Sequence, residues 1–375
     1  MTTGSRRVLV WRWGWLAPSE TFIRSQFDAY ASWTPIALGA ERVASASARP
    51  EDRVLFGSSP ADRVLKVVFR LWDWSPRLKR AIRSIDPDLI HAHFGGDASR
   101  VRRVARQLRK PLIVTLHGAD VTARPSKRGM RGMRNRHRLT KVFRDADLLI
   151  AVSEHIAQAA RELGADGRKL VVLPIGVPWS PAPSVATRSG ILFVGRFVEK
   201  KGIADLVAAY ARLPADLKRE HPLRLVGAGP LEAEIAERAR HDDVDIEMPG
   251  FVPQEVIATL LAESAVLAVP SHMAADGDTE GLPTVVFEAA RASIPIVGYA
   301  HAGIPEAVQH EVTGLLAPER DVATLARYLE RVLRDPQYAC ALGSAGRKRF
   351  EREFVVDSRT AALEKHYDGL IIRNI

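Results

Sequence analysis

Two groups of residues in the second half of the chain have the types and spacing to hold a phosphorylated ligand. The first follows an apolar run at 191–194, where Gly195 and Arg196 precede Lys201 and the start of a helical pattern near Gly202. Glycine at a strand end lets a ligand approach the backbone, and the amides of a helix N-terminus attract anions. Arginine and lysine together suit a nucleotide diphosphate. The structural alternative is a turn glycine followed by solvent-facing charges.

The second group surrounds the start of another helix, in the segment DGDTEGLPTVVFEAAR from Asp276. Pro283 is expected in the first helical turn, because its missing amide proton would have no partner there. Glu280 then lies in the loop before the helix, where it can accept hydrogen bonds from sugar hydroxyls. Glu288 lies about two turns along, where it can bind both hydroxyls of a ribose. A general acid/base pair is the competing function, and a position on the helix surface is the structural alternative.

Metal chemistry has little support in the sequence. Asp276 and Asp278 could belong to a metal site, but no cluster of histidines or carboxylates accompanies them. His91 and His93 alternate along a predicted strand and so point to one face, yet no third ligand has an evident spacing. We therefore expect no metal ion and no cofactor, and we assign the two histidines to a strand end or to the acceptor side.

The elements that position these groups alternate between short β-branched runs and amphipathic helical patterns, which is typical of parallel sheets covered by helices. The stretch 174–190 is rich in proline and serine and predicts an interdomain linker. Residues 321–367 are helical by pattern. Strands are expected at 8–13, 53–56, 89–91, 112–115, 148–151, 170–173, 191–194, 223–226, 244–247, 266–269 and 295–298, and helices at 98–108, 154–163, 203–212, 231–240 and 284–292.

Composition indicates a folded protein of two α/β domains. The chain has 375 residues, of which 46% are hydrophobic and 26% charged, so extensive disorder is not expected. The single cysteine, Cys340, forms no internal disulfide and fits a reducing compartment; we expect it to be buried and inert. Arg12 interrupts the apolar N-terminal run, and no run reaches the roughly 20 residues of a membrane span. A cytoplasmic location is therefore expected.

The net charge of +10 is concentrated in one stretch from Arg124 to Arg144, which contains no acidic residue. Such a run favours an anionic partner, namely membrane headgroups, nucleic acid or a pyrophosphate-bearing substrate. A solvated helix face is the alternative. Aromatic residues are not interleaved with the run, so nucleic acid lacks a stacking platform and is not expected as a partner. Peripheral contact with the inner face of an anionic membrane remains open.

Several motifs in order along the chain resemble the retaining glycosyltransferases of family four, which have GT-B architecture, and in particular their bacterial exopolysaccharide and colanic-acid branch. The resemblance extends over nearly the whole chain. The motifs are SETFI from Ser19, LIHAHFG from Leu89, VTLHGADVT from Val114, SEHI from Ser153, LPIGV from Leu173, VGRFVEKKG from Val194, VGAGPLEAEI from Val226, EGLPTVVFEA from Glu280 and HAGIPEAV from His301. Where relatives often carry a glycine-rich loop after the first strand, this chain has GWLAPSETFI from Gly14, in which Ser19 could cap the first helix.

The resemblance implies a fold, a reaction and a set of site residues. The fold would be α/β, with two Rossmann-like domains (1–177 and 191–352) whose parallel sheets face a central cleft, a linker at 178–190, and a C-terminal helix at 353–375 that crosses back to the first domain. The enzyme would transfer a sugar from a nucleotide-sugar donor to a glycan or lipid-linked acceptor, with retention of the anomeric configuration and without a metal ion. The donor would more readily be a UDP-sugar than a GDP-sugar. Catalytic roles would fall to His117, Glu280, Arg196 and Lys201, and donor contacts to Gly195, Arg196, Lys201, Glu280, Gly281, Leu282 and Glu288.

Two other classes of function stay open at this point. A nucleotide-sugar epimerase could share the fold, although it would need acid/base groups at the ring carbons of the sugar. A basic protein that binds nucleic acid or membrane is the non-enzyme alternative, suggested only by the net charge. The donor sugar, its base and the acceptor are not identified, because pocket contacts of about 1–3 kcal/mol each decide them.

Overall fold

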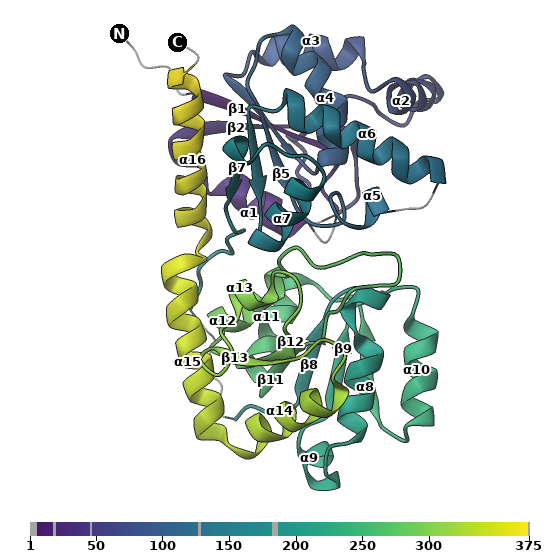
Figure 1. The fold of residues 1–375 in the computed structure, drawn as a ribbon, viewed down its shortest axis with the longest axis vertical. Coiled ribbons are helices and arrows are strands. Elements are labelled where there is room, and N and C mark those ends of the chain that lie inside the picture. Colours follow the sequence, from purple (N-terminus) through teal and green to yellow (C-terminus); the bar gives the residue numbers. More distant parts are fainter. Residues whose placement is uncertain (1–5, 18–19, 46, 127–128, 182–186, 374–375) are drawn as a thin grey trace. The chain divides into compact units, whose positions relative to one another are not determined.

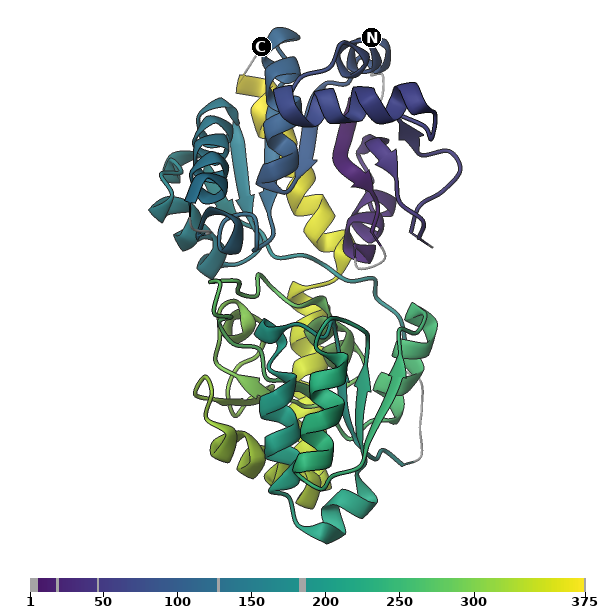
Figure 2. The ribbon, with the colours of Figure 1, turned by 90° about the vertical axis from the view of Figure 1, so that its right-hand side faces the viewer.

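The computed structural model describes residues 6–17, 20–45, 47–126, 129–181 and 187–373. The chain divides into two compact units, of which the first comprises residues 1–178 together with 356–375 and the second comprises residues 179–355. Each unit consists of a parallel sheet with helices on both faces (Figure 1, Figure 2). The predicted fold class, α/β with two parallel sheets, is confirmed.

The first unit contains a seven-stranded sheet in the order β3-β2-β1-β4-β5-β6-β7, and every pairing in it is parallel. The chain reverses its direction across the sheet between β1 and β4, and open α/β sheets bind ligands at the carboxyl ends of strands beside such a reversal. The strands are β1 (Arg6–Trp15), β2 (Trp33–Arg42), β3 (Arg53–Val54), β4 (Leu89–His93), β5 (Leu112–Leu116), β6 (Leu148–Ala151) and β7 (Leu170–Val172).

Helices from both ends of the chain cover this first sheet. The C-terminal helix α16 belongs to the first unit (Figure 1). Its Leu363 and Tyr367 pack in the core with Val8 and Ile113. The helices of this unit are α1 (Thr21–Asp28), α2 (Pro60–Trp72), α3 (Pro76–Ile85), α4 (Gly95–Gln107), α5 (Ala123–Ser126), α6 (Gly129–Asp145), α7 (Glu154–Glu162) and α16 (Val356–Arg373).

The second unit repeats the arrangement with a six-stranded parallel sheet in the order β10-β9-β8-β11-β12-β13. Its reversal lies between β8 and β11. The strands are β8 (Ile191–Val194), β9 (Leu223–Val226), β10 (Ile246–Gly250), β11 (Val266–Val269), β12 (Ile296–Tyr299) and β13 (Gly314–Ala317). The helices are α8 (Ile203–Ala211), α9 (Ala215–Glu220), α10 (Glu232–His241), α11 (Gln254–Glu263), α12 (Thr284–Arg291), α13 (Ile304–Ala307), α14 (Val322–Arg334) and α15 (Pro336–Glu353).

Two strands, β2 and β13, were not predicted. Strand β2 contains Pro35, which pairs with Val8, and a proline within an apolar run argues against an inner strand. Strand β13 has four residues and begins with a glycine, so its sequence signal is short. Both are held in place by a neighbouring strand rather than by their own pattern.

Several smaller predictions are wrong or lie outside the described residues. Gly14 lies within β1, so the loop begins later than the sequence indicated. Pro283 precedes α12 as its N-cap instead of lying in the first turn. Cys340 is exposed on α15, because the buried face of that helix carries Leu342 and Phe350 instead. The suggested cap at Ser19 lies outside the described residues, as do residues 182–186 of the expected linker.

Candidate functional site

In the second unit, the predicted donor residues gather where β8 ends. Gly195 follows this strand, and the Lys201 side chain passes beside it, since a Cβ built on Gly195 would lie 3.4 Å from Lys201 Cε. Gly202 then begins α8 with a φ of +65°, and a Cβ there would lie 1.9 Å from the Pro270 carbonyl oxygen. Only glycine fits this approach, which brings the start of α8 against the loop after β11.

Lys201 and Glu280 form a buried ion pair at this place. The Lys201 Nζ lies 2.9 Å from the Glu280 Oε1, and the two side chains are 16% and 8% exposed. Burial alone raises the pKa of Glu280, but the charges of Lys201, Lys200 and His301 outweigh this and lower it. The carboxylate therefore stays ionised, and an ionised carboxylate only accepts hydrogen bonds, as from sugar hydroxyls.

The loop that carries Glu280 is held by the residues just before Lys201. Lys200 Nζ lies 3.1 Å from Asp278 Oδ1 and donates to the Thr279 carbonyl oxygen at 3.0 Å. Glu199 accepts a hydrogen bond of 3.0 Å from the Ala275 amide. Asp278, considered above as a metal ligand, thus serves as an ion-pair partner of a lysine.

Glu288 and Arg196 occupy different environments from the ion pair. Glu288 is buried on α12, where burial raises its pKa against the opposing effects of Gln254 and Arg291. Arg196 is exposed after Gly195, and within the described residues its side chain forms no hydrogen bond or ion pair. Gly281 and Leu282 are buried between Glu280 and α12. The structure joins Lys201 to Glu280 directly and leaves Arg196 and Glu288 apart from that contact.

Two histidines near this loop were not assigned any role from the sequence. Arg320 Nη1 lies 2.7 Å from His272 Nε2, and arginine can only donate, so the His272 proton is on Nδ1 and points to the Met273 carbonyl oxygen at 2.9 Å. His301 Nδ1 lies 2.7 Å from Glu319 Oε2. His301 begins the HAGIPEAV motif, which was the available signal for it.

In the first unit, three histidines from β4 and the turn after β5 stack one on another. The ring centroids of His91 and His93 are 4.5 Å apart, and those of His93 and His117 are 5.3 Å apart. His93 Nδ1 lies 3.1 Å from His117 Nε2, so one of these nitrogens carries the shared proton. His91 instead contacts Thr115 Oγ1 and the Tyr367 hydroxyl of α16, which gives it a structural role in the core.

All three imidazoles are neutral near pH 7. Burial lowers the pKa of His91 to about 3 and lowers the pKa of His93 and His117 well below the usual value, with Arg12 adding to the effect on the last two. The Nδ1 of His117 is buried without a hydrogen-bond partner among the described residues. A cavity of about 10 Å³ adjoins His93 and His117, which is room for about one water molecule. His117 is thus suited to exchange hydrogen bonds with a neutral group rather than to supply positive charge.

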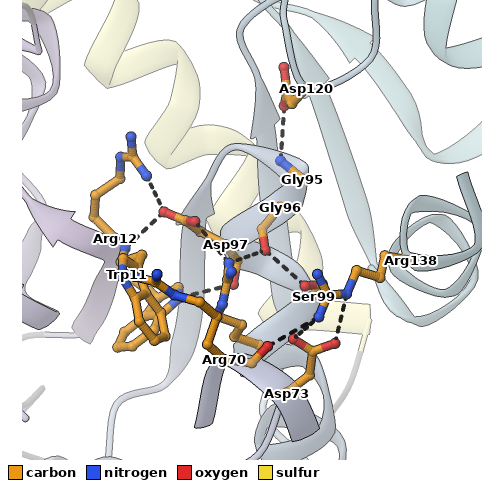
Figure 3. Close-up of polar contacts among 12 residues, drawn as sticks. Trp11, Arg12, Arg70, Asp73, Gly95, Gly96, Asp97, Ser99, Asp120 and Arg138 are labelled. Carbon is orange, nitrogen blue, oxygen red and sulfur yellow. Dashed lines mark hydrogen bonds and ion pairs between the residues drawn. The ribbon is translucent and has the colours of Figure 1, made fainter. Parts of the chain in front are cut away.

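Asp120 and Arg12, which sequence reasoning missed, hold the two loops around His117. Asp120 accepts hydrogen bonds from the amides of His117 and Gly118 through one oxygen. Its other oxygen accepts from the Gly95 amide (Figure 3). The turn chemistry of the sequence did not signal Asp120, because an Asx side chain usually accepts from the amide two residues after it, whereas Asp120 accepts from the amides of His117 and Gly118 before it. Arg12 bridges Glu20 and Asp97, which closes the segment where relatives were expected to have a glycine-rich loop.

Comparisons with known proteins agree with this architecture. Residues 37–179 match the model described as Glycosyltransferase Family 4, and residues 183–349 match the model described as Glycosyl transferases group 1. The chain belongs to glycosyltransferase family 4. Both halves of this family-four chain are therefore accounted for by matched models.

The sequence relatives of this family-four chain include proteins named for exopolysaccharide synthesis. WcaL of Escherichia coli K12, named as a colanic acid biosynthesis glycosyltransferase, is 32% identical over 64% of this chain and 60% of its own length. AmsK of Erwinia amylovora, named as an amylovoran biosynthesis glycosyltransferase, is 29% identical over 71% of this chain and 66% of its own length. The chain thus spans less than two thirds of each. The resemblance to the exopolysaccharide branch is confirmed.

A solved structure shows the fold of the family-four chain over nearly all of its length. HepE of Anabaena, solved with UDP, superposes with a TM-score of 0.79 at 18% identity, covering 97% of this chain and 100% of HepE. The fold is therefore GT-B. Among the described residues, no three His, Cys, Asp or Glu side chains are arranged to hold a metal ion. Nor does any helix in the described ranges combine the length and apolar character needed to cross a membrane.

Proposed function

We propose that this protein is a retaining, metal-independent glycosyltransferase that moves a sugar from a nucleotide-sugar donor, favoured as UDP-sugar, to a glycan or lipid-linked acceptor in cell-surface polysaccharide synthesis. The observation that carries the proposal is the buried pair of Lys201 and Glu280 at the start of α8, in a chain of family four. HepE, with the same fold, was solved with UDP.

The residues of the second unit suit the chemistry of a leaving diphosphate. Negative charge grows on the diphosphate as the glycosidic bond breaks, and groups placed to meet that charge lower the barrier. Lys201, the exposed Arg196 and the N-terminal amides of α8 supply positive charge and donors without a metal ion. Glu280 would accept bonds from the sugar hydroxyls and Glu288 from the ribose.

The role of His117 in this proposal is that of a neutral partner. Its buried Nδ1 has no partner among the described residues, and its Nε2 faces His93. We assign it a hydrogen bond to a sugar hydroxyl. Transfer is favoured over epimerisation because the paired groups of the second unit address a diphosphate and hydroxyls, and the relatives are named as glycosyltransferases.

The nucleotide site is tested by titrating UDP into the protein in a calorimeter. Replacing Glu288 by alanine removes a charged acceptor for two hydroxyls, which contributes roughly 1.5–3 kcal/mol, or about tenfold to a hundredfold in affinity. Glu263→Ala, an exposed change on the neighbouring α11, is the matched control and should leave the affinity within twofold. Equal affinity in both variants would contradict the assignment of Glu288.

The reaction itself is tested with a panel of nucleotide sugars, by following slow donor hydrolysis in excess chelator. Hydrolysis that survives the chelator and releases a sugar of unchanged anomeric configuration is expected. A strict requirement for magnesium or manganese would overturn the metal-free part of the proposal, and an inverted product would overturn the retaining part.

We further propose peripheral contact with the anionic inner face of a membrane, in the cytoplasm. The sequence pointed to the run from Arg124 to Arg144, of which residues 127–128 lie outside the described part. The structure adds an apolar strip on α2, where Val67, Leu71 and Trp72 are 57%, 56% and 73% exposed. The strip also includes Val64, Leu65 and Val68, and Arg63, Lys66 and Arg70 lie on the same helix. Apolar side chains with basic neighbours on one helix are typical of interfacial helices.

A further inference from the structure

The first unit contains an arginine-lined pocket to which no ligand has been assigned above. The pocket has a volume of about 440 Å³ and lies between the N-terminus of α4 and one face of α6. Its charged lining residues are Arg100, Arg124, Arg131, Arg134, Arg138 and Asp120. We call this site the arginine pocket. Pockets of this size hold small molecules rather than single ions.

Helix α6 places part of the basic run seen in the sequence along this pocket. Arg131, Arg134 and Arg138 recur three and four residues apart, so they share one face of α6. Arg124 joins them from α5, and its carbonyl oxygen accepts a hydrogen bond of 2.9 Å from the Asn135 side chain, which ties α5 to this face. A Cβ built on Gly96 would lie 2.8 Å from the Arg124 Nη1, so the guanidinium lies directly against the start of α4.

The positive charge of the arginine pocket exceeds the negative charge that its neighbours supply. Arg138 is paired with Asp73, which it contacts twice at 3.0 Å (Figure 3). Arg100 is paired with Asp97 at 3.3 Å. For the exposed Arg131 and Arg134, no hydrogen bond or ion pair of the side chain is found in the described part of the chain. Five guanidinium groups and one carboxylate, that of the buried Asp120, thus line this space.

Arg100 shows the effect of this surplus on a less exposed group. Its side chain is 14% exposed, and its Nε is buried without a hydrogen-bond partner among the described residues. Burial lowers the pKa of Arg100, and the charges of Arg138 and Arg70 lower it further, against Asp97 and Asp73. An anion in the pocket would relieve the repulsion among these guanidinium groups.

The geometry points to the arginine pocket as the site that binds the diphosphate ester group of a phosphorylated acceptor. A planar guanidinium matches phosphate oxygens with two parallel hydrogen bonds. A diphosphate carries more than one negative charge and can meet both Arg131 and Arg134, whereas the single charge of one carboxylate could balance only one of them. That the ligand is an acceptor rests on the proposed function; that the pocket binds a diphosphate does not.

Asp120 links this pocket to the proposed chemistry. One of its oxygens accepts from the His117 and Gly118 amides, and the other accepts from Gly95 at the pocket wall. A diphosphate held beside Gly95 would therefore place the attached acceptor sugar next to the turn that carries His117. The arginine pocket would in this way orient the acceptor by its charged end.

The test uses inorganic diphosphate as the probe, titrated in a calorimeter into the full chain. The protein is first saturated with UDP, so that the proposed donor site is occupied and the probe cannot bind there. The double variant Arg131→Gln with Arg134→Gln should bind the probe at least tenfold more weakly than wild type. The matched control is Arg80→Gln with Arg83→Gln, which removes the same charge from exposed positions on α3. It should change the affinity less than twofold.

Two outcomes would overturn the inference. No binding to wild type, or an equal loss in both double variants, would show that the pocket holds no specific anion. A second arm uses a short-chain prenyl diphosphate sugar. Tighter binding than inorganic diphosphate, lost in the pocket variant, supports the acceptor, whereas weaker binding overturns that part. If UDP fails to bind at all, the UDP-sugar donor of the proposed function is excluded, and titration without UDP still tests the pocket.

Discussion

Lys201 Nζ lies 2.9 Å from Glu280 Oε1, so the residue expected on the donor diphosphate and the residue expected on the donor sugar contact each other directly. The pair joins the start of α8 to the loop before α12. Glu280 keeps its charge because Lys201 lowers its pKa against the effect of burial. One consequence is that each residue supports the position and the ionisation of the other.

The pair should therefore show strong coupling in stability. Lys201→Ala leaves a buried carboxylate unpaired, Glu280→Ala leaves a buried ammonium unpaired, and the double variant leaves neither. We expect each single change to lower the free energy of unfolding by roughly 3 kcal/mol and the double change to cost less than the sum, with a coupling of about 1–3 kcal/mol. Urea unfolding of the four proteins measures this. Additive effects would mean that the two side chains do not interact in solution.

The backbone that positions Lys201 should depend on Gly202. Alanine there would combine a φ of +65° with a Cβ placed 1.9 Å from the Pro270 carbonyl oxygen. Gly250 is a matched control, because its φ is +77° and nothing lies within 4 Å of the added Cβ. We expect Gly250→Ala to cost about 1 kcal/mol and Gly202→Ala clearly more, since the clash adds to the backbone strain. Thermal unfolding compares them, and equal losses would show that the contact with Pro270 relaxes freely.

Sequence patterns predicted the local parts of this molecule better than the contacts between distant parts. Strands β8 and β11 have the bounds expected from their apolar runs, because parallel strands buried on both faces are continuously apolar. The place of Glu280 before α12 also followed from local pattern. The pairing of Glu280 with Lys201 did not, because it depends on the loop after β11 approaching Gly202.

The first unit shows the same limit more strongly. Pro35 interrupted the sequence signal for β2, so this strand was not predicted. The network of Arg12 with Asp97 and Glu20 was not predicted either, because it joins segments far apart in the sequence. Likewise, the run from Arg124 to Arg144 indicated an anionic partner without showing which arginines share a pocket. Which arginines line the pocket depends on how α6 is rotated about its own axis against α4. The packing of the two helices decides this rotation.

The buried histidines should make the first unit sensitive to acid. His91 has a folded pKa of about 3, against roughly 6.5 when unfolded, so the unfolded chain binds more protons between these values. Stability should therefore be constant above about pH 6.5 and fall as the pH falls below it. The slope is about 1.4 kcal/mol per pH unit for this group, or about 2 kcal/mol between pH 6.5 and pH 5.

Urea unfolding followed by tryptophan fluorescence measures this dependence, because all tryptophans except Trp179 lie in the first unit. His91→Asn should make the dependence on pH shallower, whatever it does to stability at pH 7. His241→Asn, which changes an exposed histidine of the second unit, should leave the dependence as in wild type. An unchanged slope in His91→Asn would show that this residue does not titrate as its burial implies.

The apolar strip on α2 should contribute to membrane binding independently of the arginines on α6. Val67→Ser with Leu71→Ser removes two exposed apolar side chains of the strip, while Phe69 still anchors the helix in the core. If each side chain contributes about 1 kcal/mol on entering the interface, the pair should weaken binding roughly thirtyfold. Cosedimentation with vesicles containing anionic phospholipid measures the change.

The control, Val256→Ser with Val312→Ser, alters exposed apolar residues of the second unit and should bind as wild type does. Salt should weaken the contribution of Arg63, Lys66 and Arg70 but not that of the apolar strip, because only charges are screened. Wild-type protein that ignores these vesicles at low salt, or an equal loss in both variants, would exclude α2 as the contact and favour a soluble acceptor.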